Sequence, residues 1–146
     1  MPFGEWGIFF NGDRSLGKIR EAADLVKKYA GPKDSILTFN VEIPVQGGYR
    51  IPRECVIGEF TYFPTMPVHL QEKYHLLGLE RLVREIESGN HRILCMGNRE
   101  FAVMAGGNEE IARQLKELID RKYLQVGAVK NYGQFNQDLF VYVAKY

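Results

Sequence analysis

ILTFN (residues 36–40) runs directly into VEIPVQGGYRIPRECVIGEFTYFP (residues 41–64), and the fold follows from this junction. The first five residues form a nearly continuous apolar run. They lack the alternation of apolar and polar residues that is typical of a strand with one solvent-exposed face. Such a run is typical of a strand covered on both faces. The residues after it include several that remove sheet hydrogen-bond donors or permit unusual backbone angles, so a long loop or an edge ribbon is predicted: Pro44, Gly47, Gly48 and Pro52.

Three helices are predicted around this strand. The first has apolar residues at three- and four-residue spacing from Leu16 to Val26, with Asp13 or Ser15 as its cap and Gly31-Pro32 after its end. The second is expected from Pro67 to Ser88. The third follows Asn108, where Glu109 and Glu110 favour the positive end of the helix dipole.

The remaining apolar runs predict further strands at residues 92–96, 101–105, 123–131 and 138–145, the last two forming an antiparallel hairpin. Residues 36–40, 92–96 and 123–129 are expected to be neighbouring inner strands. This order of elements predicts an α/β three-layer sandwich with a mixed, mostly parallel, Rossmann-like sheet. The whole chain, residues 1–146, is expected to be a single soluble α/β domain.

Composition and charge argue against several classes of protein. The chain has 45% hydrophobic and 25% charged residues and a net charge of +1, so it lacks the positive field that attracts nucleic acid. No stretch reaches the roughly 18 consecutive apolar residues of a membrane-spanning helix, and we expect no transmembrane segment in this chain. Cys55 and Cys95 lie in or beside apolar runs and are predicted to be buried free thiols.

Motifs for catalysis or cofactor binding are weak. His69 and His75 are six residues apart, which places them on different faces of a helix, so no metal site is expected. The serines lack a nucleophile motif and the cysteines lack a neighbouring histidine in sequence. Gly106-Gly107-Asn108 before a helix resembles a phosphate cradle, but the two glutamates after it would repel a phosphate. We therefore assign no catalytic residue, no metal and no cofactor.

Two regions remain as candidates for ligand contact. In an open, largely parallel sheet, ligands are expected at the carboxyl ends of the strands, which are followed here by residues 40–42, 97–100 and 106–108. The segment from Asn40 to Pro64 also combines aromatic and charged side chains, as surfaces that bind sugars or peptides do. Its candidate contact residues are Arg50, Glu59, Phe60 and Tyr62. The alternative is a rigid loop that covers one end of the sheet.

The segments SLGKIREAADLVKKYAGPKDSILTF, GGYRIPRECVIGEFTYFP and VGAVKNYGQFNQDLFVYVAKY together resemble the part of dolichyl-phosphate-mannose-type (protein mannosyltransferase-like) glycosyltransferases that follows the last membrane helix. The central motif is the most specific of the three: Gly48, Arg50, Pro52, Gly58, Glu59, Phe60, Tyr62, Phe63 and Pro64. The resemblance implies an extracytoplasmic domain of an enzyme that transfers sugar from a polyprenyl-phosphate donor. Catalytic acidic residues of that family lie in loops of the membrane portion, which this sequence does not contain, so we expect the chain alone to be inactive.

Two functions are consistent with the sequence. In the first, the chain is a non-catalytic domain of a polyprenyl-phosphate-sugar-dependent glycosyltransferase, attached to the membrane through the rest of the parent protein. Its partners would then be the membrane helices of the parent transferase or the acceptor. In the second, it is a free-standing cytoplasmic α/β domain that binds a nucleotide or a phosphosugar.

Overall fold

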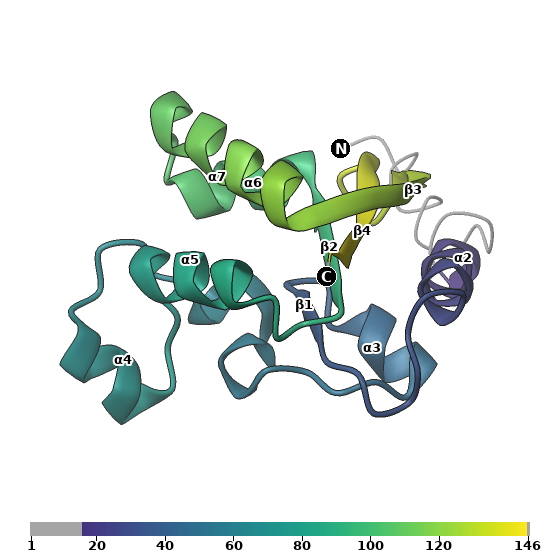
Figure 1. The fold of residues 1–146 in the computed structure, drawn as a ribbon, viewed down its shortest axis with the longest axis horizontal. Coiled ribbons are helices and arrows are strands. Elements are labelled where there is room, and N and C mark those ends of the chain that lie inside the picture. Colours follow the sequence, from purple (N-terminus) through teal and green to yellow (C-terminus); the bar gives the residue numbers. More distant parts are fainter. Residues whose placement is uncertain (1–15, 146) are drawn as a thin grey trace, which may run out of the picture.

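The computed structural model describes residues 16–145 (Figure 1). The capping role predicted for Asp13 or Ser15 lies outside these residues. None of the described helices is both long enough and apolar enough to cross a membrane.

A four-stranded mixed sheet forms the centre of the fold. Its strands are β1 (Ile36–Thr38), β2 (Ile93–Gly97), β3 (Tyr123–Tyr132) and β4 (Gln137–Ala144), in the spatial order β1-β2-β4-β3. β1 pairs in parallel with β2, Leu37 opposite Leu94, and β4 runs antiparallel to both of its neighbours. Three strands therefore point the same way and β4 points the other way.

Helices cover the two faces of this sheet. On one face lie α2 (Leu16–Lys27) and α3 (Glu42–Gly47), and on the other lie α5 (Leu79–Ser88), α6 (Asn98–Ala105) and α7 (Glu109–Lys122) (Figure 1). All residues of β1 and β2 are buried. The predicted α/β sandwich with a closing antiparallel hairpin is confirmed, as is the two-sided cover of residues 36–38.

The segment predicted as one helix from Pro67 to Ser88 is instead two, α4 (Val68–Tyr74) and α5. His75 adopts left-handed backbone angles after α4, with φ of 56°. Leu77 is then buried in a bridge with Tyr62, and Gly78 is extended at the start of α5. Burial of Leu77 in the core thus interrupts the helical pattern.

Two strand predictions were also wrong. Residues 101–105 belong to helix α6, because the Glu100 carboxylate accepts a hydrogen bond from the Gly97 backbone N–H and caps the helix directly after β2. β4, rather than β3, is the neighbour of β2, which leaves β3 at the edge of the sheet.

The predicted loop after Asn40 contains α3 and two short 3-10 helices, η1 (Arg53–Cys55) and η2 (Gly58–Thr61).

Leu37 provides a test of the doubly covered sheet. Its side chain is 1% exposed and packs in the cluster beneath α5 to α7. Leu37→Ala should lower the free energy of unfolding by about 2–5 kcal/mol, measured by urea denaturation. Leu124→Ala on the exposed side of β3 should change it by less than about 0.5 kcal/mol, and equal effects of the two variants would contradict this packing.

Candidate functional site

A cleft of about 490 Å³ lies at the carboxyl ends of β1 and β2, beside the turn that joins β3 to β4. Because β3 runs in the same direction as β1 and β2, this turn meets the same edge of the sheet. The cleft is lined by residues from five segments: Ile19; residues 39–42; residues 57–60; Arg99 and Glu100; and residues 132–135 with Gln137. It is therefore assembled from parts of the chain that are far apart in sequence.

Gly58 brings the η2 segment against the end of β1. Its φ is +65°, and a Cβ atom at this position would lie 2.8 Å from the carbonyl oxygen of Phe39. Both the backbone angle and the close approach favour glycine. The approach places Glu59 and Phe60 on the wall of the cleft.

An ion pair connects this wall to helix α6. Arg99 donates two hydrogen bonds to the Glu59 carboxylate, one of them 2.7 Å long. The guanidinium carbon also lies 4.1 Å from the centre of the Phe135 ring, in a cation–π contact. The hydrogen bonds to Glu59 raise the pKa of Arg99, and the guanidinium is paired with that carboxylate.

Glu100 and Gln137 form the floor of the cleft. The Gln137 amide donates to both oxygens of the buried Glu100 carboxylate, at 3.0 and 2.9 Å. Its carbonyl oxygen accepts from the backbone N–H of Arg99 at 2.7 Å. These bonds fix the start of α6 relative to the start of β4 and satisfy the buried carboxylate.

The cleft lining also includes a tyrosine–carboxylate hydrogen bond and one unsatisfied donor. The Tyr132 hydroxyl donates to Glu42 at 2.7 Å, and burial together with the Glu42 charge raises the pKa of Tyr132. The side-chain nitrogen of Asn40 is buried and finds no hydrogen-bond partner among the described residues. Such a donor is costly unless a ligand or water accepts its hydrogen.

The charge of the cleft is negative. Among its described lining residues, Arg99 has the only cationic side chain, against the carboxylates of Glu42, Glu59 and Glu100. Glu42 and Glu100 also stand in the first turns of α3 and α6, where they complement the helix dipoles. The electrostatics favour neutral over anionic ligands.

The structure separates the four contact residues predicted from sequence. Glu59 and the 78% exposed Phe60 line the cleft together. Arg50 is exposed but bridges to Ser35, ahead of β1 and so at the other end of that strand. Tyr62 lies in the core instead of on the cleft: it is 6% exposed, packs on Phe39 and donates a 2.6 Å hydrogen bond to the Met104 carbonyl.

Of the three segments expected at the carboxyl ends of strands, two line the cleft, residues 40–42 and residues 99–100 of the 97–100 segment. Residues 106–108 do not line it, because they follow helix α6 rather than a strand. The hairpin residues that line the cleft, 132–135 and Gln137, were missed as site residues. Their strand direction, which follows from the inner position of β4, is the signal that would have identified them.

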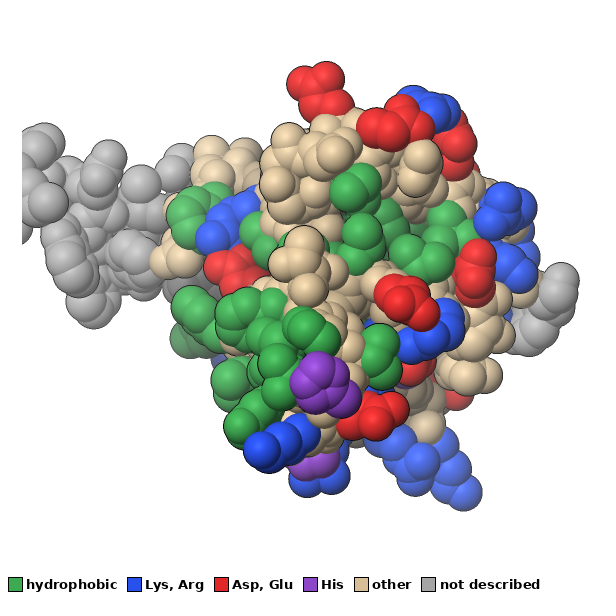
Figure 2. Space-filling view, turned by 90° about the vertical axis from the view of Figure 1, so that its left-hand side faces the viewer, with side chains coloured by type: hydrophobic (Ala, Val, Ile, Leu, Met, Phe, Trp, Pro, Cys, Tyr) green, Lys and Arg blue, Asp and Glu red, His purple; other side chains and the backbone are tan. Residues whose placement is uncertain are grey.

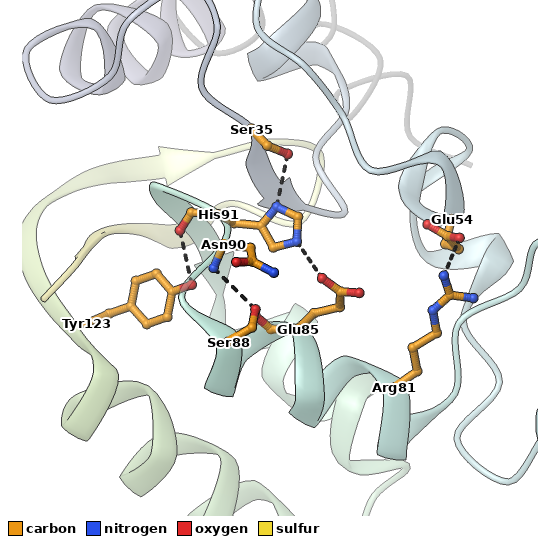
Figure 3. A network of polar contacts seen from close by, with 8 residues as sticks. All are labelled: Ser35, Glu54, Arg81, Glu85, Ser88, Asn90, His91 and Tyr123. Atoms are coloured by element: carbon orange, nitrogen blue, oxygen red, sulfur yellow. Dashed lines mark hydrogen bonds and ion pairs between the residues drawn. The ribbon is translucent and has the colours of Figure 1, made fainter. Parts of the chain in front are cut away.

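A second polar network lies before β1 and β2, at the opposite ends of these strands (Figure 3). The Nδ1 atom of His91 is 2.9 Å from the Ser35 hydroxyl, and its Nε2 atom is 2.8 Å from the Glu85 carboxylate. The Tyr123 hydroxyl donates to the His91 carbonyl at 3.1 Å. None of these residues lines the cleft, and the network joins α5 and the start of β3 to the loops before β1 and β2.

The cysteines are buried and free, as predicted. Burial raises the pKa of Cys55 to about 12 and raises that of Cys95 as well, so both thiols are protonated at neutral pH. No group of three metal-ligating side chains occurs in the described part of the chain.

No family model, curated protein or solved structure matches this chain.

Substitutions of Tyr62 and Arg50 test whether the first side chain is buried and the second exposed, as the structure shows. Tyr62→Ala should lower the free energy of unfolding by about 3–5 kcal/mol, because it removes a buried ring. Arg50→Ala should change the free energy of unfolding by less than about 0.5 kcal/mol, because the Arg50 side chain is exposed. Thermal or chemical melts measure both. A Tyr62→Ala protein as stable as the wild type would show that this side chain is not in the core.

Proposed function

We propose that this chain is a non-catalytic, ligand-binding domain of a polyprenyl-phosphate-sugar-dependent glycosyltransferase, and that its cleft holds a neutral saccharide portion of the acceptor. One observation carries the proposal: Gly58, Glu59 and Phe60 of the family-like motif form a wall of the cleft. The part of the sequence that carries the resemblance is thus also the part that shapes the candidate site.

The chemistry of the cleft suits a neutral sugar. Phe60 and Phe135 present partly exposed rings on which the apolar face of a pyranose can stack. The carboxylates of Glu42 and Glu59 accept hydrogen bonds from hydroxyl groups. An open cleft with apolar rings and a few fixed polar groups is a typical small-ligand site.

The nucleotide or phosphosugar alternative is disfavoured by charge. A phosphate in this cleft would face three carboxylates, and Arg99 is already paired with Glu59. Binding it would require breaking that ion pair or placing like charges together. The alternative stays testable because the affinity for a phosphorylated sugar is measured beside that for the neutral sugar in the experiment below.

Under this proposal the domain acts on the extracytoplasmic side of the membrane, and its partners are the acceptor and the membrane helices of the parent transferase. The family resemblance assigns sugar transfer to acidic residues of that membrane portion. The contribution of this domain is then to hold and orient the acceptor.

Calorimetric titration of the chain with mannobiose and with mannose 1-phosphate tests the ligand class. We expect weak but saturable binding of mannobiose and weaker binding of the phosphate. Phe60→Ala should reduce mannobiose affinity by roughly tenfold, since stacking on one ring contributes about 1–1.5 kcal/mol. The fold should be unaffected because this ring is exposed.

Val45→Ala is the matched control, because Val45 is also an exposed apolar residue but lies on α3 outside the cleft. It should bind like the wild type. Tighter binding of mannose 1-phosphate than of mannobiose would favour the alternative. Equal losses in both variants, or no binding of either ligand, would contradict the proposed site.

A further inference from the structure

An exposed apolar surface extends from the rim of the cleft over helix α4. We call it the apolar patch and define it by six side chains that are 42–78% exposed: Val56, Ile57, Phe60, Phe63, Val68 and Tyr74. Figure 2 shows hydrophobic side chains gathered at one corner of the molecule beside exposed histidines. The α4 region contains two exposed histidines, His69 and His75, whereas His91 is buried.

The backbone beneath the exposed side chains of the patch is fixed by hydrogen bonds. Tyr62 bridges to Leu77, and the Phe63 N–H donates to the Leu77 carbonyl at 2.9 Å. The Gln71 amide of α4 donates to the Met66 carbonyl at 2.6 Å and accepts from the Gly78 N–H at 3.0 Å. The two segments that carry the patch, residues 56–63 and 68–74, are therefore held together by buried contacts.

The segment that carries the patch, residues 53–75, has a small excess of positive charge. Glu54 pairs with Arg81 at 2.6 Å and Glu59 pairs with Arg99, so both carboxylates are neutralised. Arg53 and Lys73 have no carboxylate partner among the described residues, and Glu72 is the remaining exposed acid of residues 53–75. With both ion pairs neutral, these residues carry two positive charges and one negative charge, a net of +1.

We infer that the apolar patch docks on the interface of a lipid bilayer and inserts its aromatic and aliphatic side chains among the headgroups. Large apolar side chains exposed together on a monomer usually mark an interaction surface. Phenylalanine, tyrosine and branched aliphatic side chains beside Arg53 and Lys73 match the composition of interfacial segments, in which rings enter the boundary and cations meet anionic headgroups.

The patch adjoins the cleft. Ile57 and Phe60 belong to both, and Ile19 of α2 lines the cleft with them. The exposure and charge arguments for the patch do not depend on the function proposed for the cleft.

Flotation of the chain with vesicles tests the inference, using phosphatidylcholine alone and phosphatidylcholine mixed with phosphatidylglycerol. We expect the wild type to float with both and more strongly with the anionic mixture. The double variant Val56→Ser/Val68→Ser should bind roughly tenfold more weakly, because it removes two apolar groups from the patch. Neither residue lines the cleft, so mannobiose binding should be unchanged.

The matched control is Val45→Ser/Leu124→Ser, which removes two apolar side chains on α3 and β3 that are more exposed than Val56 and Val68. It should float like the wild type. No flotation, or equal losses in the two double variants, would overturn the inference. Flotation that depends on phosphatidylglycerol but not on the patch would also overturn it. A second measurement separates lipid from protein partners: binding to the detergent-solubilised membrane portion of a parent transferase. If the chain bound no vesicles and the patch variant alone weakened this binding, the partner would be protein instead of lipid, and the inference would be overturned.

Discussion

The parallel pairing of β1 and β2, buried on both faces, is the constraint on which the rest of the structure depends. Both strands are too apolar to face water, so helices must cover each side of the sheet. Because the two strands run in the same direction, their carboxyl ends meet at one edge. Asn40 and Arg99 are thereby brought into one cleft although they are far apart in sequence.

The Glu59–Arg99 pair then determines what this edge can bind. It joins the motif segment to the helix that follows β2, and it neutralises the cationic side chain that the cleft offers. The remaining groups are carboxylates, amides and aromatic rings, which suit hydroxyl-rich neutral ligands better than phosphates. Together with the Glu54–Arg81 pair, it leaves the adjoining apolar patch without an unpaired acid from η1 or η2, which makes the patch compatible with a lipid surface.

Much of the fold was predictable from local patterns, and most of the site was not. The apolar run at residues 36–40 predicted a buried strand, which the structure shows over Ile36–Thr38, and Asn108 correctly predicted the start of α7, because local chemistry determined both. The break at His75 to Gly78 depends on burial of Leu77 against Tyr62, a tertiary contact that overrides the helical spacing. Phe60 and Tyr62 look equivalent in sequence, but a single turn of η2 exposes one and buries the other. The hairpin contribution to the cleft required the strand order, which no local pattern contains.

The central claim is that a neutral saccharide occupies the cleft at the carboxyl edge of the sheet, and a crystal structure of the chain soaked in mannobiose tests it most directly. The account predicts sugar density between Phe60 and Phe135, a hydrogen bond from a sugar hydroxyl to the Glu42 or Glu59 carboxylate, and an intact Glu59–Arg99 pair. Sugar bound only elsewhere on the surface, or an accessible cleft that stays empty under saturating soaks, would contradict it.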